Sequence, residues 1–390
     1  MDPRRPVIFL SAAEASGDEH AARLVTALRR KLPDARIVGV AGEQMAAAGC
    51  EVVADLTQQA SMLGGPVLKL GYYIRALRRI RKAMRQLKPD VHVPVDSPAL
   101  NWHLARTAKQ IGATVVYYIA PQVWAWAPWR VRKMARLTDH VACILPFEEL
   151  YLRDRGVNAS YVGHPLLEGL PDRPDPMPDL IDAWSQGTWR VALLPGSRSG
   201  EIAAHCRPLA LVAGAIRSRW PKAQCTFTAR SEATAASIRK AVGGALPEGT
   251  DIVVGQTRQV LAGSHFAVAA SGTVTLEVAY FGVPMVVVYR VGLPLRILGK
   301  FLGRWGIPTP SFSLVNILAG RKIVPELMPW GGRMSQLIGC VMEAMEEPGY
   351  LLETREELIA VVESLRTQDL CHASERTSDL IVQALAARRK

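Results

Sequence analysis

The chain lacks the features that mark membrane-spanning and secreted proteins. No uncharged apolar stretch approaches the roughly 20 residues that a transmembrane helix needs. The apolar run after the basic start Met1–Arg5 soon meets Glu14 and Asp18, so it is too short for a signal peptide. We therefore expect a cytoplasmic protein.

Motifs for disulfides, metals and several nucleotides are also missing. The six cysteines form no C-x-x-C pair and no Cys/His cluster at zinc spacing, which predicts free thiols and no structural metal. The chain has no P-loop, no intact G-x-G-x-x-G after its first apolar run and no Asp-x-Asp pair. We expect neither a cofactor nor a metal ion.

Acidic residues are too few to balance the basic ones. The formal net charge of the 390 residues is +12, which predicts an anionic partner: nucleic acid, a membrane surface or a phosphorylated substrate. Hydrophobic residues make up 49% and charged residues 21%, as in ordinary globular proteins. This length suits two α/β domains.

Short apolar runs alternate with segments of helical periodicity, which is typical of doubly wound parallel α/β sheets. The expected strands in the first half are residues 7–11, 37–40, 91–95, 115–119 and 141–145. In the second half they are residues 191–194, 252–254, 266–270 and 285–288.

Proline content marks the expected boundary between two domains. We predict a first domain at residues 1–165, a proline-rich linker at 166–189, a second domain at 190–340 and terminal helices at 341–390.

The sharpest local signal is the turn after residues 191–194. Gly196, Ser197 and Arg198 separate this expected strand from a periodic helix that contains Glu201. Amide groups at a helix start favour an anion, and Arg198 adds a cation. The alternative is an ordinary turn in which Ser197 caps the helix and Arg198 is solvated.

A second turn in the same half has the same design. Ser271, Gly272 and Thr273 follow a buried strand and open a helix, where Ser271 or Thr273 can act as the cap. If the two helix starts converge, they can hold a diphosphate, and Glu277 can accept hydrogen bonds from ribose hydroxyls. In the alternative, Glu277 only complements its own helix dipole.

In the first half, Asp96 follows an expected strand, and open α/β sheets bind ligands at this edge. A carboxylate there can act as a general base. Equally, Asp96 can simply cap the next helix. In the opening turn, Ser16 or Asp18 is expected to cap the first helix. Trp124, Trp126 and Trp129 favour core packing over lining an acceptor cleft.

Residues 61–88 carry many basic side chains, interleaved with apolar ones, and no acidic residue. This pattern predicts contact with an anionic membrane, and residues 290–304 are a second candidate. A core helix with a solvated basic face is the alternative. No recognition motif accompanies the charge, so we expect no nucleic-acid partner.

Together these motifs resemble lipid-A-disaccharide synthase, from the first strand to about Glu326. The resemblance is carried by the residues at 14–18, 39–42, 45, 49–50, 88–90, 95–98, 123–126, 145–148, 163–165, 193–198, 270–277 and 316–321.

The resemblance implies a GT-B fold: two Rossmann-like domains that face a cleft, with a C-terminal helix that crosses back. It implies an inverting transfer from UDP-2,3-diacylglucosamine to 2,3-diacylglucosamine 1-phosphate (lipid X) that forms a β-1,6 disaccharide and UDP without a metal. The family consists of peripheral proteins on the inner face of the inner membrane. The sequence leaves a homodimer open.

The resemblance also implies roles for individual residues. Asp96 corresponds to the family's essential aspartate, and Arg198 and Asn316 to residues important for activity. The nucleotide site corresponds to Ser197, Ser271, Gly272, Thr273 and Glu277.

Two positions depart from the family pattern: Ala13 stands where glycine is usual, and Ala99 where an acidic residue is common. Both put the identity of the acceptor in question. Two alternatives to the predicted enzyme are a transferase or epimerase on another UDP-amino sugar and a non-catalytic nucleotide- or membrane-binding relative.

Overall fold

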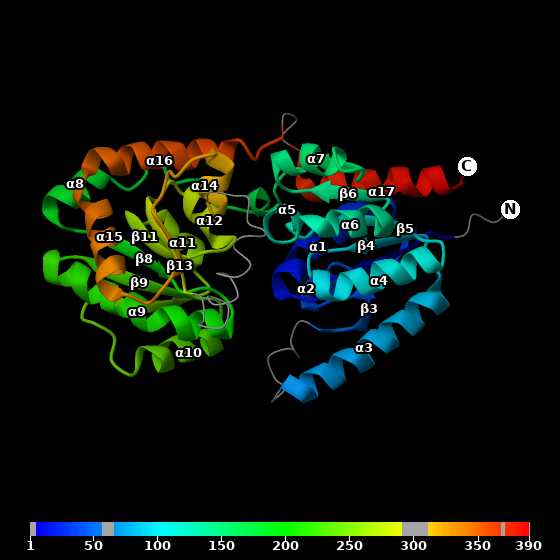
Figure 1. Ribbon diagram of the computed structural model, residues 1–390, viewed down its shortest axis with the longest axis horizontal. Helices are drawn as coiled ribbons and strands as arrows, with labels where there is room; N and C mark the ends of the chain where they lie inside the picture. The colour runs from blue at the N-terminus through cyan, green and yellow to red at the C-terminus, as the bar shows by residue number, and fades with distance from the viewer. Residues whose placement is uncertain (1–4, 57–65, 291–310, 368–370, 390) are drawn as a thin grey trace. The chain divides into compact units, whose positions relative to one another are not determined.

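The structure, a computed structural model, describes residues 5–56, 66–290, 311–367 and 371–389. It divides into two compact units (Figure 1). Unit 1 comprises residues 1–168 and 365–390, and unit 2 comprises residues 169–364. None of the described helices is long and apolar enough to cross a membrane.

Unit 1 is built on a seven-stranded parallel sheet in the order β3-β2-β1-β4-β5-β6-β7. Its strands are β1 (Val7–Ser11), β2 (Arg36–Val40), β3 (Glu51–Ala54), β4 (Val91–Pro94), β5 (Thr114–Tyr118), β6 (His140–Cys143) and β7 (Ala159–Tyr161). Its helices are α1 (Ala15–Lys31), α2 (Glu43–Ala47), α3 (Pro66–Leu87), α4 (Pro98–Gln110), α5 (Val123–Trp126), η2 (Pro128–Arg130), α6 (Val131–Leu137), α7 (Pro146–Arg153), η3 (Pro165–Leu167) and α17 (Ala373–Arg389).

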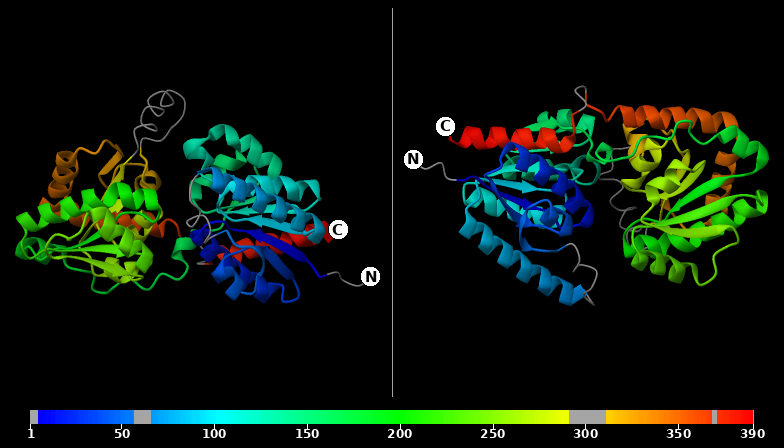
Figure 2. Two further views of the ribbon diagram at one scale, coloured as in Figure 1. Left: turned by 90° about the horizontal axis from the view of Figure 1, so that it is seen from below. Right: turned by 180° about the vertical axis from the view of Figure 1, so that it is seen from behind.

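Helices cover both faces of this sheet because its strands are apolar on both sides. Side chains of α3, α4 and α6 form one core layer, with Ile80, Leu104 and Met134 as members. The other layer comes from α1, α2 and α17, with Leu24 and Ile381 as members. Seen from behind, α1 and α17 lie side by side (Figure 2).

Unit 2 has a six-stranded parallel sheet in the order β10-β9-β8-β11-β12-β13. Its strands are β8 (Arg190–Leu194), β9 (Gln224–Ala229), β10 (Thr250–Val254), β11 (Phe266–Ala270), β12 (Met285–Arg290) and β13 (Glu326–Trp330). Its helices are α8 (Leu180–Gln186), α9 (Ser199–Arg219), α10 (Glu232–Val242), α11 (Thr257–Ala262), α12 (Val274–Tyr280), α14 (Leu314–Ala319), α15 (Met334–Glu346) and α16 (Pro348–Glu363).

The segment predicted as a linker, residues 166–189, differs from that prediction. Its first residues belong to unit 1 and the rest to unit 2. The prolines end at Pro178, after which the Asp179 carboxylate accepts the amide of Ile181 at 2.9 Å and so caps α8. Trp189 is fully buried in the core of unit 2. The proline content of this segment was visible in the sequence, but the helix α8 that follows the last proline was not predicted.

Three further outcomes concern the sequence predictions. None of the six cysteines forms a disulfide, as predicted. The chain ends in helices α15, α16 and α17, and α17 belongs to unit 1. The candidate membrane segment 290–304 falls almost wholly outside the described residues, as do residues 61–65.

Candidate active site

Each sheet has one point where the strand order reverses, and the predicted site residues other than Asn316 follow the strands that flank it. In unit 1 this point lies between β1 and β4, and Asp96 comes two residues after the end of β4. In unit 2 it lies between β8 and β11, which pair through Leu194 and Ala269. Open α/β sheets bind ligands at these reversals, outside the carboxyl ends of the strands.

The backbone around Asp96 is strained. Asp96 has φ +49°, Ser97 φ +43° and Ile119, which follows the neighbouring strand β5, φ +55°. Left-handed conformations are rare for residues other than glycine, and for a β-branched residue they are true outliers. Each costs about 1–3 kcal/mol, and such residues cluster at functional sites. Three of them together single out this edge of unit 1.

A buried polar network holds the strained segment in place. The main-chain oxygen of Asp96 accepts a hydrogen bond from Asn101 Nδ2 at 2.7 Å and another from the Tyr117 hydroxyl at 2.8 Å. Asn101 Nδ2 also lies 3.1 Å from the oxygen of Val95. Asn101 and Tyr117 are fully buried. Together they fix where the Asp96 side chain begins.

Ser11 and His92 extend the network beneath Asn101. The Ser11 hydroxyl donates to Asn101 Oδ1 at 2.6 Å and lies 3.0 Å from His92 Nε2. Since the one hydroxyl proton goes to Asn101, His92 must donate from Nε2. Burial lowers the pKa of His92 to about 3, so the ring is neutral at physiological pH. Sequence reasoning missed all four network residues.

Asp18 has a different role from the predicted one. Helix α1 begins at Ala15 without a side-chain cap, and Asp18 lies in its first turn. Its buried carboxylate accepts the amides of Gly42 at 2.7 Å and Gln44 at 3.0 Å, so it caps α2. The expectation that Asp18 or Ser16 caps α1 was wrong. The carboxylate of Asp18 instead satisfies the amides of the next helix, which the fold brings to it.

The turn after β8 is built around Glu201. Gly196 has φ +102°, and a Cβ atom there would lie 2.5 Å from Glu201 Oε2. That oxygen accepts the amides of Ser197 at 2.9 Å and Arg198 at 3.2 Å. Ser197 is not the cap, because Arg198 occupies the N-cap position of α9.

These contacts change which groups of the turn can meet an anion. The Glu201 carboxylate already accepts hydrogen bonds from the amides of Ser197 and Arg198. These two amides therefore stabilise the turn and are not available to an anion. The Arg198 side chain is 70% exposed, with Nη1 3.5 Å from Glu201 Oε1. An anion here would meet this guanidinium and the first amides of α9, at Ser199 and Gly200.

The turn after β11 leaves its polar groups near the surface. Gly272 and Thr273 are exposed, and Ser271 and Glu277 are half-buried. Thr273 occupies the N-cap position of α12, but its side chain makes no capping bond. Thr275 is buried and donates its hydroxyl to the Gly272 oxygen at 2.8 Å. The capping role expected of Ser271 or Thr273 is therefore absent.

Asn316 is buried, and its amide is fully used within unit 2. Its Oδ1 accepts the amides of Ile323 at 2.8 Å and Val324 at 3.0 Å. Its Nδ2 donates to the Val324 oxygen at 2.9 Å and to Glu326 Oε2 at 3.1 Å. Glu326 in turn accepts the amide of Ser313 at 3.0 Å. Asn316 therefore fixes the connection from α14 to β13.

Trp124 and Trp129 have opposite environments. Trp124 is buried, and its indole nitrogen donates to Glu148 Oε1 at 2.9 Å. Burial raises the pKa of Glu148 to about 7. Trp129 is 66% exposed. The packing role favoured for the tryptophans therefore fits Trp124 but not Trp129. The side chain of Trp126 is not among those that the structure describes.

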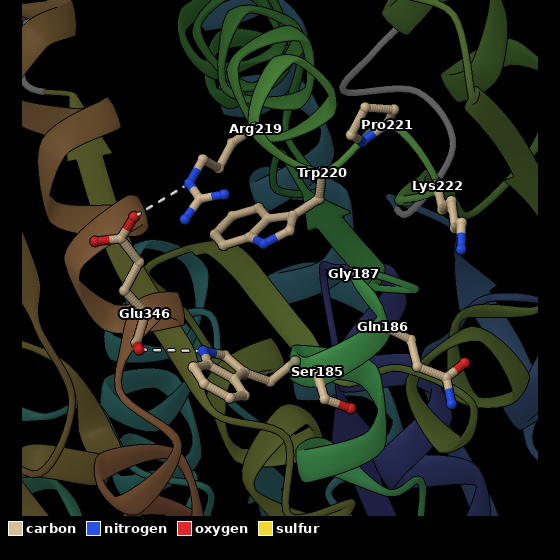
Figure 3. Close-up of a pocket in the computed structure, with 9 residues that line it drawn as sticks. Ser185, Gln186, Gly187, Arg219, Trp220, Pro221, Lys222 and Glu346 are labelled. Atoms are coloured by element: carbon tan, nitrogen blue, oxygen red, sulfur yellow. Dashed lines mark hydrogen bonds and ion pairs between the residues drawn. The ribbon is translucent and has the colours of Figure 1, made fainter.

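An open groove of about 640 Å³ lies elsewhere in unit 2 (Figure 3). It is lined in part by Trp184, Trp220 and Arg219, and Arg219 Nε lies 3.5 Å from Glu346 Oε1. Trp184 precedes β8, and Arg219 and Trp220 precede β9, so these residues place the groove at the amino ends of the two strands. None of the predicted site residues lines it.

Comparison with known proteins identifies the family. A family model described as lipid-A-disaccharide synthetase matches residues 8–377. The chain belongs to this family. The lipid-A-disaccharide synthase of Myxococcus xanthus is 38% identical over 335 residues, 83% of this chain and 84% of the relative. That of Geobacter sulfurreducens is 34% identical and covers 97% of each chain. The predicted family is confirmed.

Solved structures show the same fold at low identity. A UDP-GlcNAc 2-epimerase from Neisseria meningitidis, bound to UDP-GlcNAc, aligns with TM-score 0.58 and 12% identity, covering 98% of this chain and 99% of the other. A calicheamicin glycosyltransferase aligns with TM-score 0.57 and 16% identity over the same shares. This member of the lipid-A-disaccharide synthetase family therefore has the predicted GT-B fold of two parallel-sheet α/β units.

Proposed function

We propose that the chain condenses UDP-2,3-diacylglucosamine with 2,3-diacylglucosamine 1-phosphate. The products are the β-1,6-linked lipid A disaccharide 1-phosphate and UDP, formed with inversion and without a metal ion or cofactor. Family membership over residues 8–377 supports the reaction. The observation that carries the mechanism is the position of Asp96 at the strand reversal of unit 1. Its backbone is strained, and buried hydrogen bonds from Asn101 and Tyr117 hold it in place.

Asp96 is the general base of this proposal. The 6-hydroxyl oxygen of the acceptor attacks C1 of the donor sugar, and the bond from C1 to the UDP oxygen breaks. The hydroxyl proton passes to the Asp96 carboxylate, and the electron pair of the broken bond leaves with UDP. A positioned base contributes about 10²–10⁴-fold to such a step. The buried network supports this role because it fixes the Asp96 backbone.

The donor is assigned to the two turns of unit 2. Arg198 and the first amides of α9 stabilise the charge that develops on the departing diphosphate, as electrostatic preorganisation requires. The turn after β11 and the helix α12 that follows it supply the remaining contacts: Ser271, Gly272 and Thr273 near the diphosphate and Glu277 of α12 at the ribose. Gly196, Glu201 and Asn316 shape the backbone and need not touch the donor.

A membrane contact completes the proposal. Both substrates carry acyl chains, so an enzyme that joins them must work at a bilayer. We place the chain on the inner face of the inner membrane, held through residues 61–88, with 290–304 as a second contact. Exposed Arg75, Arg78, Arg79 and Lys82 of α3 support the first of these.

The test is turnover and nucleotide binding in Asp96→Asn, which keeps the size of the side chain. We expect kcat to fall about 10²–10⁴-fold while the Kd for UDP, measured by calorimetry, stays unchanged. The matched control is Asp154→Asn, an exposed carboxyl at the end of α7. Retained turnover in Asp96→Asn would refute the base assignment.

A second assay separates the proposed reaction from its alternatives. Purified protein is mixed with acylated or unacylated UDP-glucosamine and with lipid X, and disaccharide and free UDP are measured. We expect product only with acylated donor. Equal use of the unacylated donor would indicate another UDP-amino sugar enzyme, and the absence of disaccharide and free UDP with either donor would indicate a non-catalytic relative.

A further inference from the structure

Three helices on one face of unit 1 have no acidic residue. They are α3, α4 and α6, and the sequence contains no Asp or Glu within any of them. Their exposed surface is basic. We name it the cationic face and define it as the lysines and arginines of α3 from Arg75 to Arg85, together with Arg106 of α4 and Arg132, Lys133 and Arg136 of α6.

The charges of these helices lie close together in space. Apolar side chains of α3, α4 and α6 share one core layer, so the three helices lie on the same side of the sheet (Figure 1). Burial, and after it the charges of Lys133, Arg81 and Arg106, lowers the pKa of His103. One histidine on α4 therefore senses cations from all three helices, which makes the cationic face a single electrostatic feature.

The opposite face of the same sheet is built differently. There, Arg30 and Lys31 at the end of α1 form ion pairs with Glu375 and Asp379 of α17, and the Lys31 Nζ to Asp379 Oδ1 distance is 2.7 Å. The excess positive charge of unit 1 is thus concentrated on one side. Such a distribution orients a protein toward a negatively charged surface.

Apolar side chains accompany the cations at the surface. Trp129, immediately before α6, is 66% exposed, and Ile74 of α3 is 39% exposed. Lys133 Nζ lies 5.0 Å from the centroid of the buried Trp102 ring, which ties that cation to the body of unit 1. Exposed tryptophan beside lysine and arginine is typical of surfaces that bind at the bilayer interface.

We propose that α4 and α6 join α3 in one docking surface for an anionic bilayer, with Trp129 entering the headgroup region. The proposal rests on the membrane contact proposed above and extends it beyond residues 61–88. A bilayer fits better than a nucleic acid because exposed apolar groups lie among the cations and the proposed substrates are amphiphiles. Unit 1 then lies flat, with the α3, α4 and α6 side toward the lipid.

The test uses the full chain and sedimentation with phosphatidylcholine vesicles, with or without phosphatidylglycerol. The variant Arg106→Gln/Arg132→Gln/Arg136→Gln removes three exposed charges from α4 and α6 only and leaves the Lys133 contact with Trp102 intact. We expect it to bind anionic vesicles about 100-fold more weakly, which is about fivefold per cation. Its unfolding midpoint, and its activity on detergent-dispersed substrates, should match those of the wild type.

The matched control removes three exposed cations from unit 2: Arg207→Gln/Arg239→Gln/Lys240→Gln. It has the same net charge as the first variant and should bind vesicles like the wild type. A second variant, Trp129→Ala, should weaken vesicle binding severalfold without changing its dependence on phosphatidylglycerol.

Three outcomes would overturn the proposal. If the α4 and α6 variant binds like the control while Arg75→Gln/Arg78→Gln/Lys82→Gln loses binding, α3 alone docks and the earlier membrane contact stands. If the wild type ignores phosphatidylglycerol, the membrane contact itself fails. If the α4 and α6 variant loses affinity for a DNA duplex but not for vesicles, the surface binds nucleic acid.

Discussion

Replacing Tyr117 by phenylalanine tests the link between the buried network and Asp96. The change removes the hydroxyl that donates to the Asp96 main-chain oxygen at 2.8 Å. The oxygen keeps its hydrogen bond from Asn101 Nδ2 at 2.7 Å, so no buried acceptor is left without a partner. The loss in the free energy of unfolding should therefore be about 1 kcal/mol, the net value of one hydrogen bond.

The catalytic effect follows from the strain at Asp96. A left-handed residue other than glycine costs about 1–3 kcal/mol, and the hydrogen bonds to its carbonyl oppose that cost. When one bond of about 1 kcal/mol is lost, the population with Asp96 in place falls by at most about fivefold. We expect kcat to fall by up to this factor, while the Kd for UDP is unchanged.

Tyr118 provides the control at the next position. Its buried hydroxyl has no hydrogen-bond partner among the described residues. Tyr118→Phe should leave kcat unchanged and leave the stability equal or slightly higher, because an unpartnered polar atom is removed. The assays are urea unfolding and steady-state kinetics on both variants.

Two results would refute this reasoning. If Tyr117→Phe is destabilised but keeps the wild-type kcat, the network does not position the base. If its kcat falls more than about 100-fold, the hydroxyl takes part in the chemistry rather than in positioning, because one hydrogen bond cannot account for that loss.

Three further predictions concern other parts of the chain. Asn316→Ala leaves buried amides and carbonyls of the α14–β13 connection without partners and should cost on the order of 3 kcal/mol in urea unfolding. Gly196→Ala places a Cβ atom 2.5 Å from Glu201 Oε2 at φ +102° and should cost about 2 kcal/mol and weaken UDP binding in calorimetry. Burial raises the pKa of Glu148 from 4.5 to about 7, so the folded state keeps a proton that the unfolded state loses as pH rises. Between pH 4.5 and 7 this lowers the free energy of unfolding by about 3 kcal/mol, and Glu148→Gln should abolish that part of the slope in urea unfolding.

Strands were predictable where both faces are buried, because continuous apolar runs such as residues 7–11 and 266–270 leave little choice of structure. Four strands were missed. The edge strands β3, β7 and β13 are half-exposed, very short or interrupted by Pro329, and β9 carries polar residues between its apolar ones. In these strands pairing, rather than hydrophobic pattern, decides the conformation.

The sequence by itself determined the family, through its ordered motifs. It also determined the two parallel α/β sheets and the strand-to-helix segments that carry Asp96, Arg198 and Glu277, because each such segment depends on local order: an apolar run, then small or polar residues, then a helix. Only the tertiary structure decided how these parts cooperate. The pairing of β1 with β4, and of β8 with β11, brings the turns of each unit to one edge. Ser11 meets Asn101, 90 residues away, because both are buried against the same strands. Hydrogen-bond partners so far apart follow from strand order and helix packing, which local pattern does not specify.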